Sequence, residues 1–204
     1  MNTAHPWREA EAHLSAVDPV MARLIAERGP CTLGPDDDLF GSLCDSIIGQ
    51  QISPKAADSI ARRVRALFPG GHPVPGRLAE LDQELLRSAG LSPQKQRYLK
   101  DLAAKCQDGT IRLASLRDLP AAEIERELLA VQGIGPWTVT MFLIFALNRP
   151  DVLPVGDLGL RKGAQLAYGL PELPGPAELR RLAQPWHPYA TIASWYLWRA
   201  LDNK

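Results

Sequence analysis

The chain has 204 residues, of which 46% are hydrophobic, and its 23 Lys/Arg are balanced by 23 Asp/Glu. This length can hold one domain or two small lobes with a substantial core. The zero net charge excludes a global basic field, so nucleic-acid binding would depend on local clusters of charge. The three cysteines are too few and too widely spaced for a disulfide framework or a four-cysteine iron–sulfur cluster. No apolar run approaches the ~18 residues of a membrane span.

The N-terminal segment is predicted to be helical over residues 8–28, with one apolar face. A break is expected near Asp18 and Pro19, and Gly29-Pro30 ends the helix. A loop rich in Gly, Pro and Asp follows. We expect residues 1–37 to pack, as a helix and loop, on the C-terminal lobe.

Residues 38–68 predict two helices joined by a polar turn. The spacing of Leu39, Leu43 and Ile47 indicates a buried helix face. Ser53 is a good N-cap for a second helix, with Pro54 at its first position. The two glutamines between these helices, Gln50 and Gln51, would ordinarily form only a polar loop.

Residues 78–118 are also predicted to form helices with capped starts. A helix over residues 78–89 ends at Gly90, and Ser92-Pro93 repeats the capping pattern of Ser53-Pro54. The next helix is expected to reach about residue 106, with Lys95 in its first turn. A connector over residues 113–119 closes this region, and residues 38–118 are predicted to form a central helical lobe.

The most informative stretch covers residues 128–163. The order Gly133-Ile134-Gly135-Pro136 predicts a tight hairpin between two helices, because glycines turn freely and Pro fits a helix start. The second helix, residues 137–147, is apolar nearly all round and should be buried. Trp137, at the mouth of the hairpin, is the expected exception.

The sequence from this hairpin to Asp157 resembles the helix-hairpin-helix DNA glycosylase superfamily. The Gly-Ile-Gly-Pro-Trp order, about twenty residues and then Val-Gly-Asp is specific, and the match to the 3-methyladenine, alkylation-repair branch runs from about Asp38 to the C-terminus. The resemblance implies an all-α fold of two helical lobes with a cleft between them. It leaves no room for the N-terminal α/β domain of some members. Residues 119–204 would form the hairpin and catalytic lobe.

Asp157 has two interpretations. An Asp at a helix start is usually an N-cap, worth about 1 kcal/mol. After a hairpin of this kind, the resemblance instead implies a catalytic carboxylate that stabilises oxocarbenium character and orients or deprotonates water. The helix dipole favours its anionic form.

The resemblance also implies the remaining site residues. Gln51 occupies the position of the side chain that fills the gap left by an extruded nucleotide. The alkylation-repair branch of the superfamily has an apolar residue at this position. His187 stands where the family usually has an arginine. A monovalent ion could sit on hairpin carbonyls near Gln132 and Ile134. The base pocket would be walled by Trp137, Trp195, Met141 and Leu158, and DNA would be contacted by Gln50, Gln51, Ser53, Lys95, Gly133, Gly135, Thr138 and Arg161.

Reaction type follows from position 137. Glycosylase/lyases of the superfamily carry a nucleophilic lysine there, whereas this chain has Trp137. We therefore expect a monofunctional, cofactor-free enzyme that flips alkylated purines out of double-stranded DNA and hydrolyses their N-glycosidic bond. A cationic base would stack on the two indoles. We expect a monomer in the bacterial cytosol, associated with the nucleoid.

Two alternatives remain open. One is a glycosylase for another damaged base, such as uracil, thymine or an oxidised purine. The other is a non-catalytic helix-hairpin-helix DNA-binding protein, in which Asp157 would only cap its helix.

Overall fold

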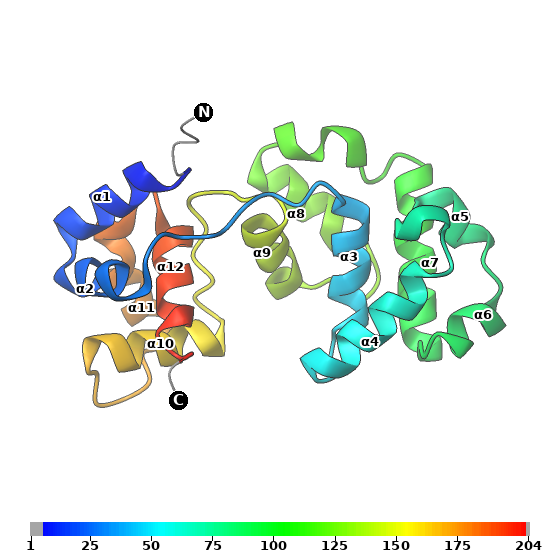
Figure 1. The fold of residues 1–204 in the computed structure, drawn as a ribbon. Helices are drawn as coiled ribbons and strands as arrows, with labels where there is room; N and C mark the ends of the chain where they lie inside the picture. Colours follow the sequence, from blue (N-terminus) through cyan, green and yellow to red (C-terminus); the bar gives the residue numbers. More distant parts are fainter. Residues whose placement is uncertain (1–5, 203–204) are drawn as a thin grey trace. The chain divides into compact units, whose positions relative to one another are not determined.

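A computed structural model describes residues 6–202, which leaves the first five residues of the predicted N-terminal segment and the last two residues of the chain outside the description. The described residues form helices and loops without strands, so the all-α prediction is confirmed (Figure 1). None of these helices combines the length and hydropathy that a membrane span needs. Backbone contacts divide the chain into two units, one of residues 1–34 and 148–204 and one of residues 35–147.

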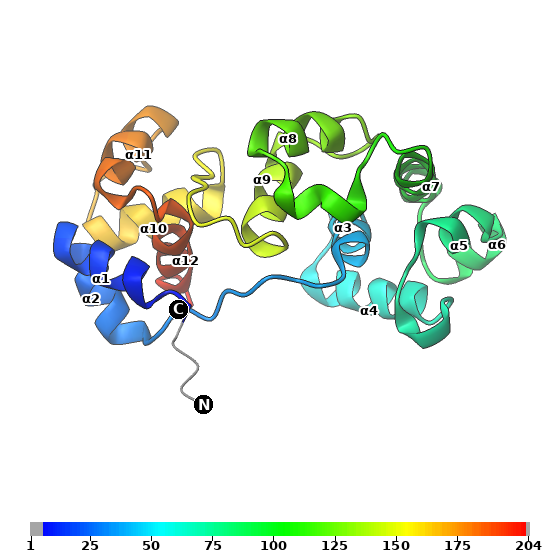
Figure 2. The ribbon, with the colours of Figure 1, turned by 90° about the horizontal axis from the view of Figure 1, so that it is seen from above.

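The first unit joins the N-terminal helices to the C-terminal ones. The blue helices α1 and α2 lie beside the orange and red helices of the chain's end (Figures 1 and 2). Helix α12 is the centre of this unit, because it contacts α1, α2 and α10 and its residues from Ala190 to Leu197 are all buried. The elements are α1 (Arg8–Val17), α2 (Pro19–Arg28), α10 (Leu158–Tyr168), α11 (Pro176–Ala183), η3 (Gln184–Trp186) and α12 (Ala190–Arg199).

The predicted break in the N-terminal helix is confirmed at Asp18. This residue has an extended backbone, and its side chain accepts hydrogen bonds from the amides of Val20 and Met21, so that a new helix starts at Pro19. Helices α1 and α2 pack against α12, within the unit that holds the C-terminal helices.

The second unit is built around α3. Leu43, Cys44 and Ile47 of this helix are fully buried, and α3 contacts α4, α7 and α9. The predicted caps Ser53 and Ser92 each accept a backbone N–H bond at the start of the following helix. The elements are α3 (Leu39–Ile48), α4 (Pro54–Arg65), η1 (Pro69–Gly71), α5 (Pro75–Glu80), α6 (Gln83–Ser88), α7 (Pro93–Gln107), η2 (Leu113–Asp118), α8 (Ala121–Leu129) and α9 (Pro136–Phe145).

The division of the chain differs from the expected boundaries at residues 37 and 118. From the sequence, helices α8 and α9 are expected to group with residues 148–204. In the structure their contacts group them with residues 35–118. The reason is that α9 packs on both α8 and α3, with Phe142 and Leu143 buried. The Asp36 amide also donates to the Ala146 carbonyl at 3.0 Å. The hairpin is therefore part of the unit that carries the Gln50-Gln51 turn.

Candidate active site

The hairpin between α8 and α9 requires glycine at position 133. Gly133 has φ +82°, and a Cβ there would lie 2.1 Å from the ring of Tyr98. The hairpin is held from α7 as well, because the Gln132 amide donates to the Asp101 carboxylate at 2.8 Å. Gly133 therefore serves two needs at once, the left-handed backbone conformation and the close approach of Tyr98.

The first turn of helix α9, which follows this hairpin, is accessible at its surface. Gly135 is its N-cap, Pro136 its first residue, and a Cβ on Gly135 would have no atom within 4 Å. Trp137 is 56% exposed, as expected for the exception on this helix. Thr138 is only 6% exposed, so its hydroxyl is not part of the open surface at this helix start.

The Gln50-Gln51 turn is tied directly to the hairpin. The Gln50 side-chain amide donates to the Gly133 carbonyl at 2.7 Å. Gln51 is exposed and has φ 59°, an uncommon conformation for a residue other than glycine. A small cavity of about 150 Å³ lies between this turn, Gly133 and the start of α7. The hairpin and the Gln50-Gln51 turn are thus one connected structure.

Lys95 is part of this connection, which changes its predicted role. Its Nζ donates to the carbonyls of Ile48 at 2.6 Å and Gln50 at 2.8 Å, where α3 ends. Loss of solvent around this ammonium group lowers the pKa of Lys95. Lys95 braces the turn from inside the protein, so it does not present its ammonium group as an open contact for DNA phosphate.

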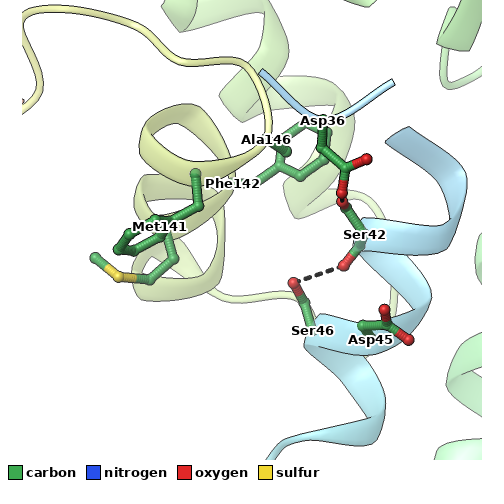
Figure 3. A pocket seen from close by; sticks show the side chains of 8 residues that line it. Asp36, Ser42, Asp45, Ser46, Met141, Phe142 and Ala146 are labelled. Atoms are coloured by element: carbon green, nitrogen blue, oxygen red, sulfur yellow. Dashed lines mark hydrogen bonds between the residues drawn. The ribbon is translucent and has the colours of Figure 1, made fainter. Parts of the chain in front are cut away.

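A larger cavity, of about 330 Å³, lies in the same unit between α3 and α9 (Figure 3). Met141, which the sequence assigned to the base pocket, is on its α9 side, and Ser42 and Ser46 of α3 are opposite. Ser46 Oγ donates to the Ser42 carbonyl at 2.9 Å, and the Ser42 hydroxyl donates to the Asp36 carboxylate.

Phe145 also lines this cavity and is 45% exposed, so the expectation that α9 is buried nearly all round was wrong at this residue. The spacing contained the signal, because Met141 and Phe145 are four residues apart and share a helix face. Two acids, Asp36 and Asp45, line this cavity. Burial raises the pKa of Asp45, an effect that its ion pair with Arg65 at 2.7 Å opposes.

Asp157 opens α10 in the other unit. Its Oδ1 accepts the Leu160 amide at 2.7 Å, which is the expected N-cap bond. The same oxygen accepts the indole N–H of Trp198 at 2.9 Å. Asp157 is half-buried, and the neighbouring Leu158 is 52% exposed. A carboxylate held by two donors next to an exposed apolar side chain fits both capping and a role in binding.

Sequence reasoning missed Trp198 as a partner of Asp157. It lies three residues after Trp195, and helical spacing alone gives both indoles to the core. The structure distinguishes them, since Trp195 is only 8% exposed and has the Arg199 guanidinium carbon 5.2 Å from its ring centroid. Trp198 is half-buried. Trp195 stays a prediction for the base pocket, while Trp198 is the indole that contacts the acid.

Two further predicted features of this unit have partners inside the protein. Arg161 Nε donates to the Pro174 carbonyl at 2.7 Å, so this side chain fastens the loop before α11. His187, which replaces the family arginine, has Nδ1 2.8 Å from the Asp151 carboxylate, and the peptide bond between His187 and Pro188 is cis. Asp151 also accepts the Ala190 amide at 3.2 Å, at the start of α12.

No cluster of three or more His, Cys, Asp or Glu side chains suited to a metal ion occurs among residues 6–202. The carbonyl of Gly133 already accepts a hydrogen bond from Gln50. A monovalent ion on the carbonyls of Gln132 and Ile134 stays a prediction.

The glycine hairpin followed by a buried helix, in an all-helical chain, defines a helix-hairpin-helix protein. Residues 44–188 match the profile of the HhH-GPD superfamily base excision DNA repair protein. The chain belongs to the HhH-GPD superfamily, and the resemblance seen in the sequence is confirmed.

Individual relatives agree with this family. The chain is 33% identical to DNA-3-methyladenine glycosylase 1 of Schizosaccharomyces pombe, over 94% of this chain and 86% of that protein. It is 28% identical to DNA-3-methyladenine glycosylase 2 of Escherichia coli, over 89% of this chain and 64% of that protein.

Solved structures of relatives have the same fold. The S. pombe enzyme in complex with abasic DNA superposes with a TM-score of 0.82, covering 94% of this chain and 95% of that chain at 33% identity. A DNA-3-methyladenine glycosidase from Bacillus halodurans superposes with a TM-score of 0.84 at 36% identity, covering 98% of this chain and 91% of that chain.

Proposed function

We propose that this protein is a monofunctional DNA glycosylase that removes alkylated purines from double-stranded DNA by hydrolysing the N-glycosidic bond. The relatives named as 3-methyladenine glycosylases support the reaction and the kind of base. The structure solved with abasic DNA supports DNA as the partner. The observation that carries the mechanism is Asp157, an acid fixed at a helix start by Leu160 and Trp198.

The chemistry asked of Asp157 is electrostatic. Cleavage of the glycosidic bond develops positive charge on the sugar, and a fixed carboxylate beside it lowers the barrier. The same group can orient or deprotonate the attacking water. A purine alkylated on a ring nitrogen is already cationic, so it leaves without a second, protonating carboxyl group. One acid is therefore sufficient.

DNA binding is assigned to the hairpin unit. Main-chain amides around Gly133, Gly135 and Thr138 lie at the start of α9, and the N-terminus of a helix is a favourable binding site for a phosphate group. Gln51 is the candidate to enter the duplex, because it is exposed on a turn that Gln50 and Lys95 hold against the hairpin. Ser53 is exposed at the start of α4 and completes this surface.

Apolar side chains are the candidates for contact with the base. Trp137 and Leu158 are exposed, and Met141 lines the cavity in Figure 3. Trp195 is the second indole of the sequence prediction. A cationic base gains about 0.5–2 kcal/mol from each indole face it contacts, which a neutral base does not gain to the same extent.

Position 137 supports hydrolysis without a lyase step. A tryptophan cannot form the Schiff base that a lysine forms with the sugar. The reaction then ends at an intact strand with an abasic site. An enzyme that repairs chromosomal DNA is expected in the compartment that holds this DNA, which in a bacterium is the cytosol. All the assigned residues lie on one chain, so we propose a monomer.

A non-catalytic DNA-binding role is the second candidate, and one observation favours it. The bond from Leu160 to Asp157 is what an ordinary N-cap makes, so capping alone accounts for the residue type. In that case the protein would bind DNA through its hairpin and release no base.

The test uses DNA treated with a methylating agent and purified wild-type protein. We expect release of methylated purines, detected by chromatography, and a strand that breaks only after alkali treatment. Borohydride should trap no covalent protein–DNA adduct. Absence of base release would support the binding role, whereas a trapped adduct would show a lyase nucleophile and overturn the monofunctional assignment.

A further inference from the structure

We propose that Trp198 is a positioning residue, which fixes the carboxylate of Asp157 for the reaction. This inference rests on the proposed function of Asp157. Its starting point is the 2.9 Å hydrogen bond from the indole Nε1 to Asp157 Oδ1.

Capping alone leaves the carboxylate incompletely fixed. A single bond from the Leu160 amide, 2.7 Å from Oδ1, allows the carboxyl plane to rotate about that contact. The indole N–H meets the same oxygen from α12, a different helix. Two donors from different directions on Oδ1 set the plane of the group and hence the direction in which Oδ2 points. A carboxylate that stabilises a developing charge depends on such preorganisation.

Two glycines of α10 allow α12 to pack close enough for Trp198 to reach Asp157. Gly159 and Gly163 are four residues apart and lie on the face toward α12. A Cβ on Gly163 would be 2.2 Å from the Leu197 carbonyl oxygen. A Cβ on Gly159 would be 3.1 Å from Asp157 Oδ1 and 3.3 Å from Trp198 Cδ1. The two glycines thus permit the approach that brings the indole to the acid.

The same unit contains a matched bond without a catalytic role. Trp186 Nε1 donates to Asp18 Oδ2 at 2.9 Å, and Asp18 is also an N-cap. Trp186 is fully buried, whereas Trp198 is half-buried. A substitution of Trp186 therefore reports what the loss of an indole–carboxylate bond does to folding alone.

The experiment compares Trp198→Phe, Trp198→His and Trp186→Phe under single-turnover conditions on methylated DNA. Phenylalanine keeps a ring without the N–H, while histidine places Nε2 at the ring position of the indole nitrogen. We expect Trp198→Phe to lower the rate of base release about 10-fold, the effect of one hydrogen bond to a charged group. Its affinity for DNA with an abasic-site analogue should stay within about twofold of wild type. Trp198→His should recover most of the rate, and Trp186→Phe should lower the melting temperature without lowering the rate.

A double-mutant comparison shows whether Trp198 acts through the acid. In an Asp157→Asn background, Trp198→Phe should change the residual rate by less than about twofold. Wild-type release combined with an unchanged rate in Trp198→Phe would overturn this inference and leave the proposed function standing. A 10-fold loss that persists without Asp157 would also overturn it. No release by the wild type would remove the proposed function itself, and this inference with it.

Discussion

Asp18 and Asp157 occupy the same local position in one unit and differ in almost everything around it. Each is the N-cap of a helix, and each carboxylate accepts an indole N–H at 2.9 Å. Asp18 is 7% exposed, and its oxygens also receive the amides of Val20 and Met21 and the Tyr168 hydroxyl. Asp157 is half-buried, beside the exposed Leu158.

A capping motif does not by itself reveal the role of its acid. Asp18 is surrounded by donors of its own unit, which stabilises the junction of α1, α2 and η3. Asp157 has a comparable cap but is half-buried, and the next residue, Leu158, exposes an apolar side chain without a gain in stability. We therefore assign stability to the first acid and chemistry to the second.

The largest effect on stability is expected for Asp18→Ala. The variant loses a helix cap and leaves the buried Trp186 N–H and Tyr168 hydroxyl without their acceptor. Together these losses should lower the free energy of unfolding by about 3 kcal/mol. Urea denaturation measures this change. Base release at a temperature where the variant is folded should stay near the wild-type rate, and a loss of activity greater than the loss of folded protein would contradict the contrast.

An intermediate effect is expected for Trp137→Ala. This indole is 56% exposed, so its removal should lower the free energy of unfolding less than Asp18→Ala does. The rate of methylated-base release should fall about 10-fold, since stacking of a cationic base on an indole is worth about 0.5–2 kcal/mol. Trp137→Phe is the matched control and should keep part of the rate. Equal rates in all three proteins would remove Trp137 from the base pocket.

The smallest effect is a pH dependence of stability, which tests the hydrogen bond between Tyr168 and Asp18. Burial, together with the bond to Asp18, raises the pKa of Tyr168 well above its usual value. The neutral phenol is thus favoured in the folded state. Its contribution to stability is fully present below the unfolded pKa of about 10 and is lost as the pH rises above it.

Between pH 9 and pH 11 the wild type should therefore lose about 1.4 kcal/mol more of its unfolding free energy than Tyr168→Phe does. Denaturation curves at the two pH values give both numbers. Parallel losses in the two proteins would show that Tyr168 does not ionise on unfolding in this range, against its assigned environment.

The sequence predicted the local features well because they depend on neighbouring residues. The caps Ser53 and Ser92, the break at Asp18 and the hairpin at Gly133 all follow from short-range chemistry. The hairpin, with the Val-Gly-Asp that follows it, also carried the resemblance that the family match confirmed.

The remaining features depend on partners that are distant in the sequence. Lys95 resembles an exposed basic residue in the sequence, yet its ammonium group is held by two carbonyls at and just after the end of α3, 47 and 45 positions away. Trp198 contacts Asp157 across 41 positions through the Gly159 and Gly163 face of α10. No periodicity within one helix predicts which of two indoles meets an acid on another helix.

The most direct test of the central claim is the single-turnover rate of base release by Asp157→Asn, measured together with its affinity for DNA carrying an abasic-site analogue. Asparagine still caps α10, so folding and DNA affinity should persist. We predict a rate at least about 100-fold below wild type, the usual effect of removing a transition-state electrostatic contact. A variant that binds DNA and releases methylated purines at the wild-type rate would show that Asp157 is only a cap.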